Sequence, residues 1–284
     1  MNYLVTGRNG QLAAEFLRRF DAAGAEAAAP DESELDITDA AAVDRVVAAV
    51  RPGVILNCAA YNLVDQAEKD SDTAFRVNAA GPRNLAESAR RHGSFLVHFS
   101  SDYVFDGTKE NGLYAEDDAT GPLNEYGRSK LAGEGAVTEV LGDRALVLRL
   151  SWVFGRGKQN FIHKFLERSK SGETLKVTCD EFSVPTWTGT VADVTLRALD
   201  RGLHGLFHLT NSGYCSRYEW AKLILRVRGE ERFIRPVSLD SFPLPARRPR
   251  FSAMNNGSIA STLGIDIATW EEAVSEFLRR DAIA

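Results

Sequence analysis

Short apolar runs alternate with segments of helical periodicity through the first half of the chain. The apolar runs predict strands at residues 2–6, 25–29, 54–60, 95–101 and 144–155. Apolar positions with the period of a helix join these runs at residues 11–23, 39–50, 72–91 and 125–140. The alternation predicts successive βαβ units. With right-handed crossovers, these give an α/β fold with a Rossmann-type doubly wound parallel sheet.

The pattern in the second half is less regular. It predicts helices at residues 161–169, 189–200, 216–229 and 269–281, and strands at 175–178 and 206–210. We therefore expect a smaller, helix-rich C-terminal lobe that binds the substrate. The predicted dinucleotide-binding domain comprises residues 1–155 and about 174–209, and the predicted substrate lobe comprises about 156–173 and 210–284.

Composition and charge exclude several classes of partner. The net charge is -5, and no run of basic residues provides a surface for nucleic acid or an anionic membrane. No apolar run reaches the length of a membrane span, and the N-terminus lacks the features of a signal peptide, so we expect a cytoplasmic protein. The cysteines, Cys58, Cys179 and Cys215, are odd in number and lack CxxC spacing, which predicts neither a disulfide framework nor a zinc site.

The segment TGRNGQLA follows the first predicted strand and opens the first helix. Glycine permits a tight turn and a close approach of the backbone to a pyrophosphate, and the small residue at position 13 lets helix and strand pack closely. The N–H groups at the start of such a helix attract phosphates. A dinucleotide is therefore predicted to bind at Gly7, Arg8, Asn9, Gly10, Gln11 and Leu12.

Two charged side chains give opposite predictions about the cofactor. Asp31 lies about 20 residues beyond the glycine turn, where an acid binds the ribose 2′-hydroxyl of NADH. Arg8, inside the turn, would instead bind the 2′-phosphate of NADPH. The sequence therefore leaves NADH and NADPH both open. Asp36 is a candidate for the adenine edge, and Ile37 follows it among the predicted cofactor residues.

The predicted strand at 95–101 runs into FSSD, and the helix at 125–140 carries Tyr126 and Lys130. If this helix returns to the carboxyl edge of the sheet, both side chains point from one face into the same crevice. A phenol has a pKa near ~10, which a neighbouring ammonium would lower. With Ser101 bonded to the substrate oxygen, the three residues would hold a carbonyl and protonate it.

The same tyrosine and lysine spacing also occurs by chance on solvated helices, with a lysine that extends toward water. The glycine turn, the βαβ alternation and Ser101 together favour the catalytic interpretation. The histidines show no metal-binding pair spacing and are expected in core or surface roles.

Several longer segments are more specific than these short motifs. They are TGRNGQLA, ELDITD, NCAAYNLVDQAE, VNAAGPRNLA, FSSDYVFDG, PLNEYGRSKLAGE, RLSWVFG, VPTW and ARRPRFSAM. Through them nearly the whole chain resembles the dTDP-4-dehydrorhamnose reductases, a family of the extended short-chain dehydrogenase/reductases. The resemblance implies reduction of the C4 ketone of dTDP-4-dehydro-L-rhamnose to dTDP-L-rhamnose by NADPH or NADH, as a step in nucleotide-sugar biosynthesis.

The resemblance also implies roles for individual residues. The catalytic residues that match the family are Ser101, Tyr126 and Lys130. The residues placed beside the cofactor are Ala59, Ala60, Tyr61, Asn78, Tyr126 and Lys130. The residues placed beside the nucleotide-linked 4-keto-6-deoxy sugar are Asp102, Tyr103, Trp152, Asn160 and Arg248, the last at its diphosphate. For Trp152, core packing at a strand end is an alternative of similar weight.

Two departures from the family pattern bear on the substrate. Relatives usually read GDQxGxPT where this chain has CDEFSVPTW, so Glu181 replaces an amide and Ser183 replaces a glycine. Such changes could shift the sugar preference. Some relatives use Mg2+ through glutamates at a dimer interface, but no ligands for it can be assigned in this sequence. The sequence therefore assigns no metal site, and it leaves open whether the chain forms a homodimer.

Other functions remain as alternatives. The same fold serves nucleotide-sugar epimerases, dehydratases and other reductases, although a dehydratase would need an acid where this chain has Tyr103. A non-catalytic NADP-binding regulatory subunit resembling the methionine adenosyltransferase β subunit is a further alternative. The intact Ser101, Tyr126 and Lys130 argue against the regulatory subunit.

Overall fold

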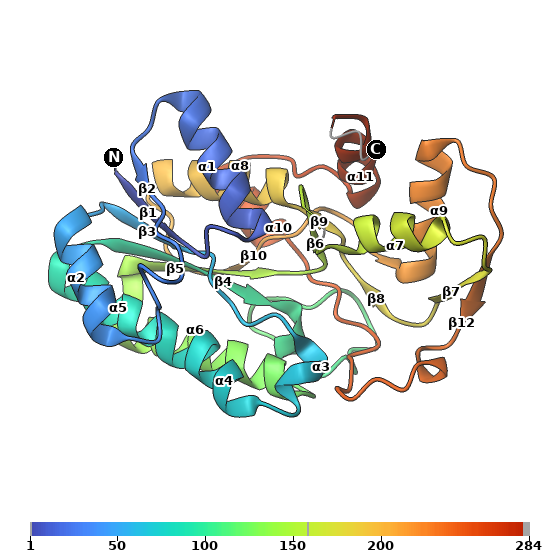
Figure 1. Cartoon of the computed structure of the whole chain (residues 1–284), viewed down its shortest axis with the longest axis horizontal. Coiled ribbons are helices and arrows are strands. Elements are labelled where there is room, and N and C mark those ends of the chain that lie inside the picture. Colours follow the sequence, from blue (N-terminus) through green and yellow to red (C-terminus); the bar gives the residue numbers. More distant parts are fainter. Residues whose placement is uncertain (1, 158, 281–284) are drawn as a thin grey trace.

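A six-stranded parallel sheet forms the centre of the larger part of the molecule in the computed structural model, which describes residues 2–157 and 159–280 (Figure 1). Its strands in spatial order are β10 (Gly205–His208), β5 (Ala145–Leu150), β4 (Phe95–Ser101), β3 (Val54–Asn57), β1 (Tyr3–Thr6) and β2 (Ala27–Ala28). Every neighbouring pair is parallel, so the predicted doubly wound sheet is confirmed.

Alternate residues of each strand face opposite helix layers. In β1, Val5 packs into one core and Leu4 into the other, and in β4, Val97 and Leu96 do the same. The helices that cover the first face are α1 (Gln11–Ala23), α8 (Thr188–Asp200) and α10 (Gly257–Leu263). Those that cover the second face are α2 (Ala40–Val50), α5 (Gly81–His92) and α6 (Glu125–Leu141). Because both faces are covered, most strand residues are apolar.

The helix predicted at 72–91 is interrupted. It consists of α4 (Ser71–Phe75), one π-helical turn (Arg76–Ala80) and α5. A π turn adds a residue to the helix, and such turns occur often at functional sites. This one carries Asn78, which is buried next to the end of β3. The interruption therefore places Asn78 beside the segment that follows β3.

The smaller lobe has its own apolar core. Its helices are α7 (Phe161–Ser169), α9 (Arg217–Arg228) and α11 (Trp270–Arg280). Its short strand pairs join β7 (Leu175–Thr178) to β12 (Ile234–Val237), β8 (Phe182–Ser183) to β11 (Cys215–Ser216), and β6 (Val153–Phe154) to β9 (Thr186–Trp187). The remaining elements among the described residues are α3 (Val64–Ala67) and the 3-10 turns Asp102–Val104, Gly142–Arg144 and Leu239–Ser241.

This packing corrects the predicted domain boundaries. Residues 174–187 belong with the smaller lobe, because β7 pairs with β12 and Leu175 and Val177 lie in its core. In contrast, α10 belongs with the larger part, since Ile259 and Leu263 pack under α1 and α8. Sequence order could not reveal either exchange because the chain crosses between the two cores more than once.

The strand predicted at 144–155 also differs. It breaks after Leu150, and Trp152 has a positive φ of 38°, which is rare for a bulky residue. The chain then enters β6 and pairs with β9 in the smaller lobe.

The last residue of the helix predicted at 269–281 lies outside the described residues. No helix among those described is long and apolar enough to cross a bilayer.

Candidate functional site

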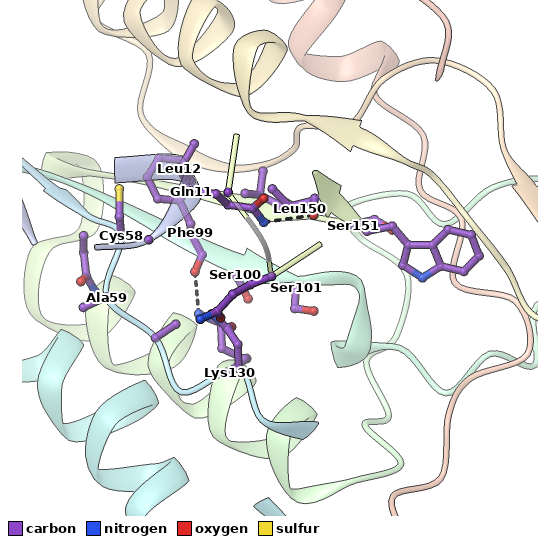
Figure 2. Close-up of a pocket in the computed structure, with 18 of the residues that line it drawn as sticks. Gln11, Leu12, Cys58, Ala59, Phe99, Ser100, Ser101, Lys130, Leu150 and Ser151 are labelled. Carbon is purple, nitrogen blue, oxygen red and sulfur yellow. Dashed lines mark hydrogen bonds between the residues drawn. The ribbon is translucent and has the colours of Figure 1, made fainter. Parts of the chain in front are cut away.

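A cavity of about 710 Å³ opens at the carboxyl ends of β1, β3 and β4 (Figure 2). The strand order reverses between β1 and β3, and open α/β sheets bind ligands at this position. Its size is within the range of about 300–1,000 Å³ that is typical of ligand pockets. The predicted residues that line it are Asn9, Gly10, Gln11, Leu12, Ala59, Ala60, Ser101, Asp102, Tyr126, Lys130 and Trp152.

The glycine turn closes one side of this cavity. Gly7 has a φ of 66°, and a Cβ there would lie 2.7 Å from the backbone nitrogen of Ala59, so only glycine fits. Gly10 precedes α1, whose first turn receives no side-chain cap. Gln11 donates from Nε2 to the carbonyl of Val153 at 3.1 Å, and its buried Oε1 has no partner among the described residues. The uncapped N–H groups suit a phosphate, and the free Gln11 oxygen suits a hydroxyl or amide N–H donor of the same ligand.

The residues present therefore fit a pyridine dinucleotide. The start of α1 provides N–H groups for the pyrophosphate, and the small side chains of Ala59 and Ala60 leave space along the wall. In Figure 2, Lys130 of α6 points toward the end of β4, while Gln11 and Leu12 lie on the other side of the cavity. A ligand in this cavity thus contacts the glycine turn and the α6 side chains together.

Close packing of α6 against the end of β4 positions the reactive side chains. Gly127 permits the contact, because a Cβ there would lie 2.2 Å from the carbonyl oxygen of Tyr103. Asn124 caps the helix by accepting the N–H of Gly127 at 2.8 Å. As predicted, Tyr126 and Lys130 share a helix face, and both line the cavity with Ser101 of β4.

Burial controls the protonation of these groups. Burial raises the pKa of Tyr126 to about 12, although a hydrogen bond with Ser101 acts in the opposite direction. Burial also lowers the pKa of Lys130 to about 8, against the attraction of Glu134. The Lys130 ammonium donates to the carbonyl of Phe99 at 2.6 Å. The expected lowering of the phenol's pKa by Lys130 is therefore not found: in the protein alone, Tyr126 is a protonated phenol at neutral pH.

Asn78 has a different role from the one predicted. Its Oδ1 accepts the N–H of Tyr61 at 2.8 Å, and its Nδ2 donates to the Tyr61 carbonyl and the Ser129 hydroxyl, both at 3.0 Å. These bonds tie the segment after β3 to α6 beside Tyr126. Asn78 therefore positions the site from behind, and it does not line the cavity.

The cofactor residues predicted after the second strand, at positions 31–37, do not line the cavity, and their expected influence on a ligand is through charge. Ile37 is buried against α5, in the core between the sheet and helices α2, α5 and α6, so its side chain is not available to a ligand. Asp36 accepts the N–H of Thr38 at 2.8 Å. A hydrogen bond from Ser33 lowers the pKa of Asp31, and the charge of Arg8 adds to this effect. Arg8 and Asp31 are thus close enough to influence each other, and their opposing signals persist in three dimensions.

Tyr103 and Trp152 lie where the cavity meets the smaller lobe. The rings of Tyr103 and Tyr126 meet edge to face with centroids 5.7 Å apart. One face of Trp152 is covered by the guanidinium of Arg217, 3.6 Å from the ring centre. Trp152 therefore contacts both the cavity and the smaller lobe. The sequence analysis did not predict Arg217 as a residue of the site.

Two predicted substrate ligands are engaged elsewhere. Asn160 caps α7, accepting the N–H of His163 at 3.0 Å and donating to the carbonyls of Gly155 and Gly157. Arg248 makes a bidentate ion pair with Asp65, with both N–O distances at 2.7 Å. The structure gives no support for the predicted direct contacts with substrate, because the Asn160 amide is engaged within the chain and three of the five N–H donors of Arg248 already have acceptors there.

Asp102 is an anchor between the two parts of the molecule. Its Oδ2 accepts hydroxyl hydrogen bonds from Ser252 at 2.6 Å, Ser183 at 2.8 Å and Ser151 at 3.1 Å, and its Oδ1 accepts one from Ser101 at 3.2 Å. The side chain is buried, and burial raises its pKa against the effect of these bonds. These contacts favour a structural role over the predicted substrate contact.

A second cavity of about 250 Å³ lies in the smaller lobe. Its lining combines apolar side chains with basic side chains and one acid. The residues that line it include Phe161, Phe165, Val177, Lys164, Arg168, Lys176, Arg217 and Glu181. Apolar and basic side chains together suit a planar ring that carries a negatively charged group. No group of three or more metal-binding side chains occurs in the described ranges 2–157 and 159–280.

Comparisons with known proteins agree over the full length. A family model described as the RmlD substrate binding domain matches residues 1–283. A probable dTDP-4,6-dihydroxy-2-methyloxan-3-one 4-ketoreductase of Streptomyces antibioticus is 39% identical over 97% of this chain and 94% of its own. A dTDP-4-dehydrorhamnose reductase of Burkholderia thailandensis is 37% identical over 98% of each.

Solved structures show the same similarity. The crystal structure of a dTDP-4-dehydrorhamnose reductase from Clostridium acetobutylicum superimposes with a TM-score of 0.95, at 34% identity and over 100% of both chains. That of the enzyme from Bacillus anthracis, in complex with NADP, gives a TM-score of 0.93 at 34% identity over 98% of both.

Proposed function

This chain belongs to the dTDP-4-dehydrorhamnose reductase family, within the extended short-chain dehydrogenase/reductases, and we propose that it catalyses the family's reaction. The reaction is reduction of the C4 ketone of dTDP-4-dehydro-L-rhamnose to dTDP-L-rhamnose by a reduced nicotinamide dinucleotide. The observation that carries the proposal is the convergence of Ser101, Tyr126 and Lys130 on one cavity beside the glycine turn.

The reduction requires a proton donor at the ketone oxygen. When bound, the dinucleotide supplies the hydride. Tyr126 donates the proton, and its raised pKa keeps it protonated until the oxygen becomes basic. Ser101 turns its single O–H from Asp102 Oδ1 to the same oxygen and stabilises the charge that develops there. Lys130, held on the Phe99 carbonyl, provides positive charge beneath the phenol.

The second cavity accommodates the nucleotide of the substrate. Its apolar side chains, which include Phe165 and Val177, suit the thymine ring, and its basic side chains suit the diphosphate. The sugar then reaches Tyr126 past Tyr103 and Trp152. A second candidate of the same class is the reduction of a related dTDP-linked keto sugar, as the name of the Streptomyces antibioticus relative indicates.

Turnover by the purified chain tests this proposal. We expect stoichiometric oxidation of NADPH or NADH when dTDP-4-dehydro-L-rhamnose is added, followed as loss of nicotinamide absorbance and by identification of the sugar product. Parallel kcat/KM values with other dTDP-keto sugars identify the preferred substrate. Absence of turnover with every keto sugar and both cofactors would favour the regulatory-subunit alternative.

The opposing charges of Arg8 and Asp31 predict opposite shifts in cofactor preference. Arg8→Ala should lower the ratio of kcat/KM for NADPH to that for NADH by about 10-fold, because a charge-assisted contact to the 2′-phosphate is lost. Asp31→Asn should raise the same ratio, because repulsion of that phosphate is removed. Steady-state kinetics with both cofactors measure the ratios. A shift in the same direction in both variants would show that neither charge senses the 2′-phosphate.

A further inference from the structure

The guanidinium of Arg217 lies between the two cavities. Arg217 is the first residue of α9 and lines the smaller cavity. Its guanidinium carbon is 3.6 Å from the ring centre of Trp152, which lines the larger cavity. A ligand that extends from one cavity into the other therefore passes this guanidinium.

Arg217 has unused hydrogen-bond donors. The nearest carboxylate is that of Glu181, whose Oε2 is 3.6 Å from Nε, too far for a hydrogen bond. The side chain makes no hydrogen bond within the part of the chain that the structure describes. A guanidinium carries five N–H donors in a planar fork that matches phosphate oxygens. With only 21% of its side chain exposed, Arg217 also has little access to water as an alternative acceptor.

The position of this guanidinium is held by its neighbours. It stacks on Trp152 and lies 5.3 Å from the ring centre of Phe161 and 5.6 Å from that of Trp220. The start of α9 is fixed by a capping box between Ser216 and Glu219. A donor that is already oriented loses less conformational entropy when it binds an anion.

Arg248, in contrast, is not comparably available. Both of its terminal nitrogens bond to Asp65, and one also donates to the carbonyl of Ala246. Arg248 thus uses three of its five N–H donors within the chain, whereas Arg217 uses none in a hydrogen bond to the described residues and has more of them available for an oxyanion.

We infer that Arg217 binds a phosphate oxygen of the diphosphate that joins nucleoside and sugar, and that Glu181 weakens this contact. The inference rests on the proposed function, which supplies a substrate that spans both cavities. Glu181 is buried beside the guanidinium, so its carboxylate competes for the same donors and repels the incoming diphosphate. Glu181 thereby limits how tightly the substrate, and equally the product, is held.

Calorimetric binding of thymidine diphosphate and of thymidine to the intact chain tests this inference. Arg217→Gln should weaken diphosphate binding by about 10- to 100-fold, the range of a lost charged hydrogen bond, and change thymidine binding less than about twofold. Glu181→Gln should tighten diphosphate binding by about 3- to 10-fold. Arg226→Gln, which removes the same charge from an exposed position on α9, is the matched control and should change neither affinity.

The outcomes separate this inference from the proposed function. If the unaltered chain does not bind thymidine diphosphate, the proposed substrate class is wrong and the inference fails with it. If it binds but Arg217→Gln binds equally well, or loses thymidine to the same extent, the inference alone is wrong. Should Arg217→Gln fail to fold by circular dichroism, Glu181→Gln decides, because weaker or unchanged diphosphate binding in that variant contradicts the competition.

Discussion

Replacing Tyr126 with phenylalanine is expected to lower kcat by about 100- to 10,000-fold, the usual contribution of a positioned proton donor. The ring of Tyr126 packs edge to face against Tyr103, and phenylalanine keeps this contact. Only the hydroxyl is lost, with its hydrogen bond to Ser101 and a 3.4 Å contact to Asn62. Dissociation constants for NADPH and for thymidine diphosphate should therefore change by less than about twofold.

The matched control is Tyr114→Phe. Tyr114 is also buried, and its hydroxyl also makes a hydrogen bond, to Asp106 at 2.8 Å, but it does not line the dinucleotide cavity. Stopped-flow measurement of hydride transfer in both variants isolates the chemical step from product release. A normal rate in Tyr126→Phe would eliminate the phenol as the proton donor, and Ser101 would then be the group to test.

The parts of the site that follow from local rules could be predicted from sequence. The carboxyl ends of parallel strands meet at one edge, so Ser101 had to lie near the glycine turn, and helical periodicity placed Tyr126 and Lys130 on one face. Each of these predictions depends on residues close together in the chain, together with the order of the strands. The position of all three at one cavity agrees with them.

The predictions that gain no support from the structure concern polar side chains whose partners lie far away in sequence or inside a cap. Asn160 and Arg248 were expected to bind the substrate because of their residue types and family positions. Whether an amide or guanidinium is free for a ligand depends on which acceptors the fold brings near, and Asp65 is far from Arg248 in sequence. The predicted effect of Lys130 on the pKa of Tyr126 took no account of burial, which raises that pKa in the protein alone and depends on tertiary packing.

Asp102 accepts hydrogen bonds from serines of both parts of the molecule, and its removal is expected to lower stability strongly. The carboxylate accepts hydrogen bonds from Ser101 at the end of β4 and Ser151 after β5, and from Ser183 and Ser252 on the side of the smaller lobe. Asp102→Ala leaves these buried hydroxyls without their common acceptor. We expect a loss of about 3 kcal/mol or more in the free energy of unfolding, measured by urea denaturation.

Asp102→Asn separates the effect of charge from that of the acceptor. The amide retains an acceptor oxygen, so this variant should lose less stability than Asp102→Ala. Burial raises the pKa of Asp102 in the folded state above its unfolded value near ~3.9, so the native state binds the proton more tightly. The stabilisation that this proton gives is present at low pH and is lost as the pH rises through the folded-state pKa. The stability advantage of the unaltered chain over Asp102→Asn should therefore be larger at mildly acidic pH than at neutral pH.

Asp143→Ala is the control for loss of a carboxylate, because the Asp143 side chain is 92% exposed and pairs only loosely with His204 at 3.6 Å. It should leave the unfolding midpoint nearly unchanged at both pH values. If Asp102→Ala behaves like Asp143→Ala, the serine hydroxyls bond adequately to one another, and Asp102 does not hold the two parts together. If Asp102→Ala unfolds in two separate transitions, the carboxylate contributes to the coupling that makes the sheet and the smaller lobe unfold as a single event.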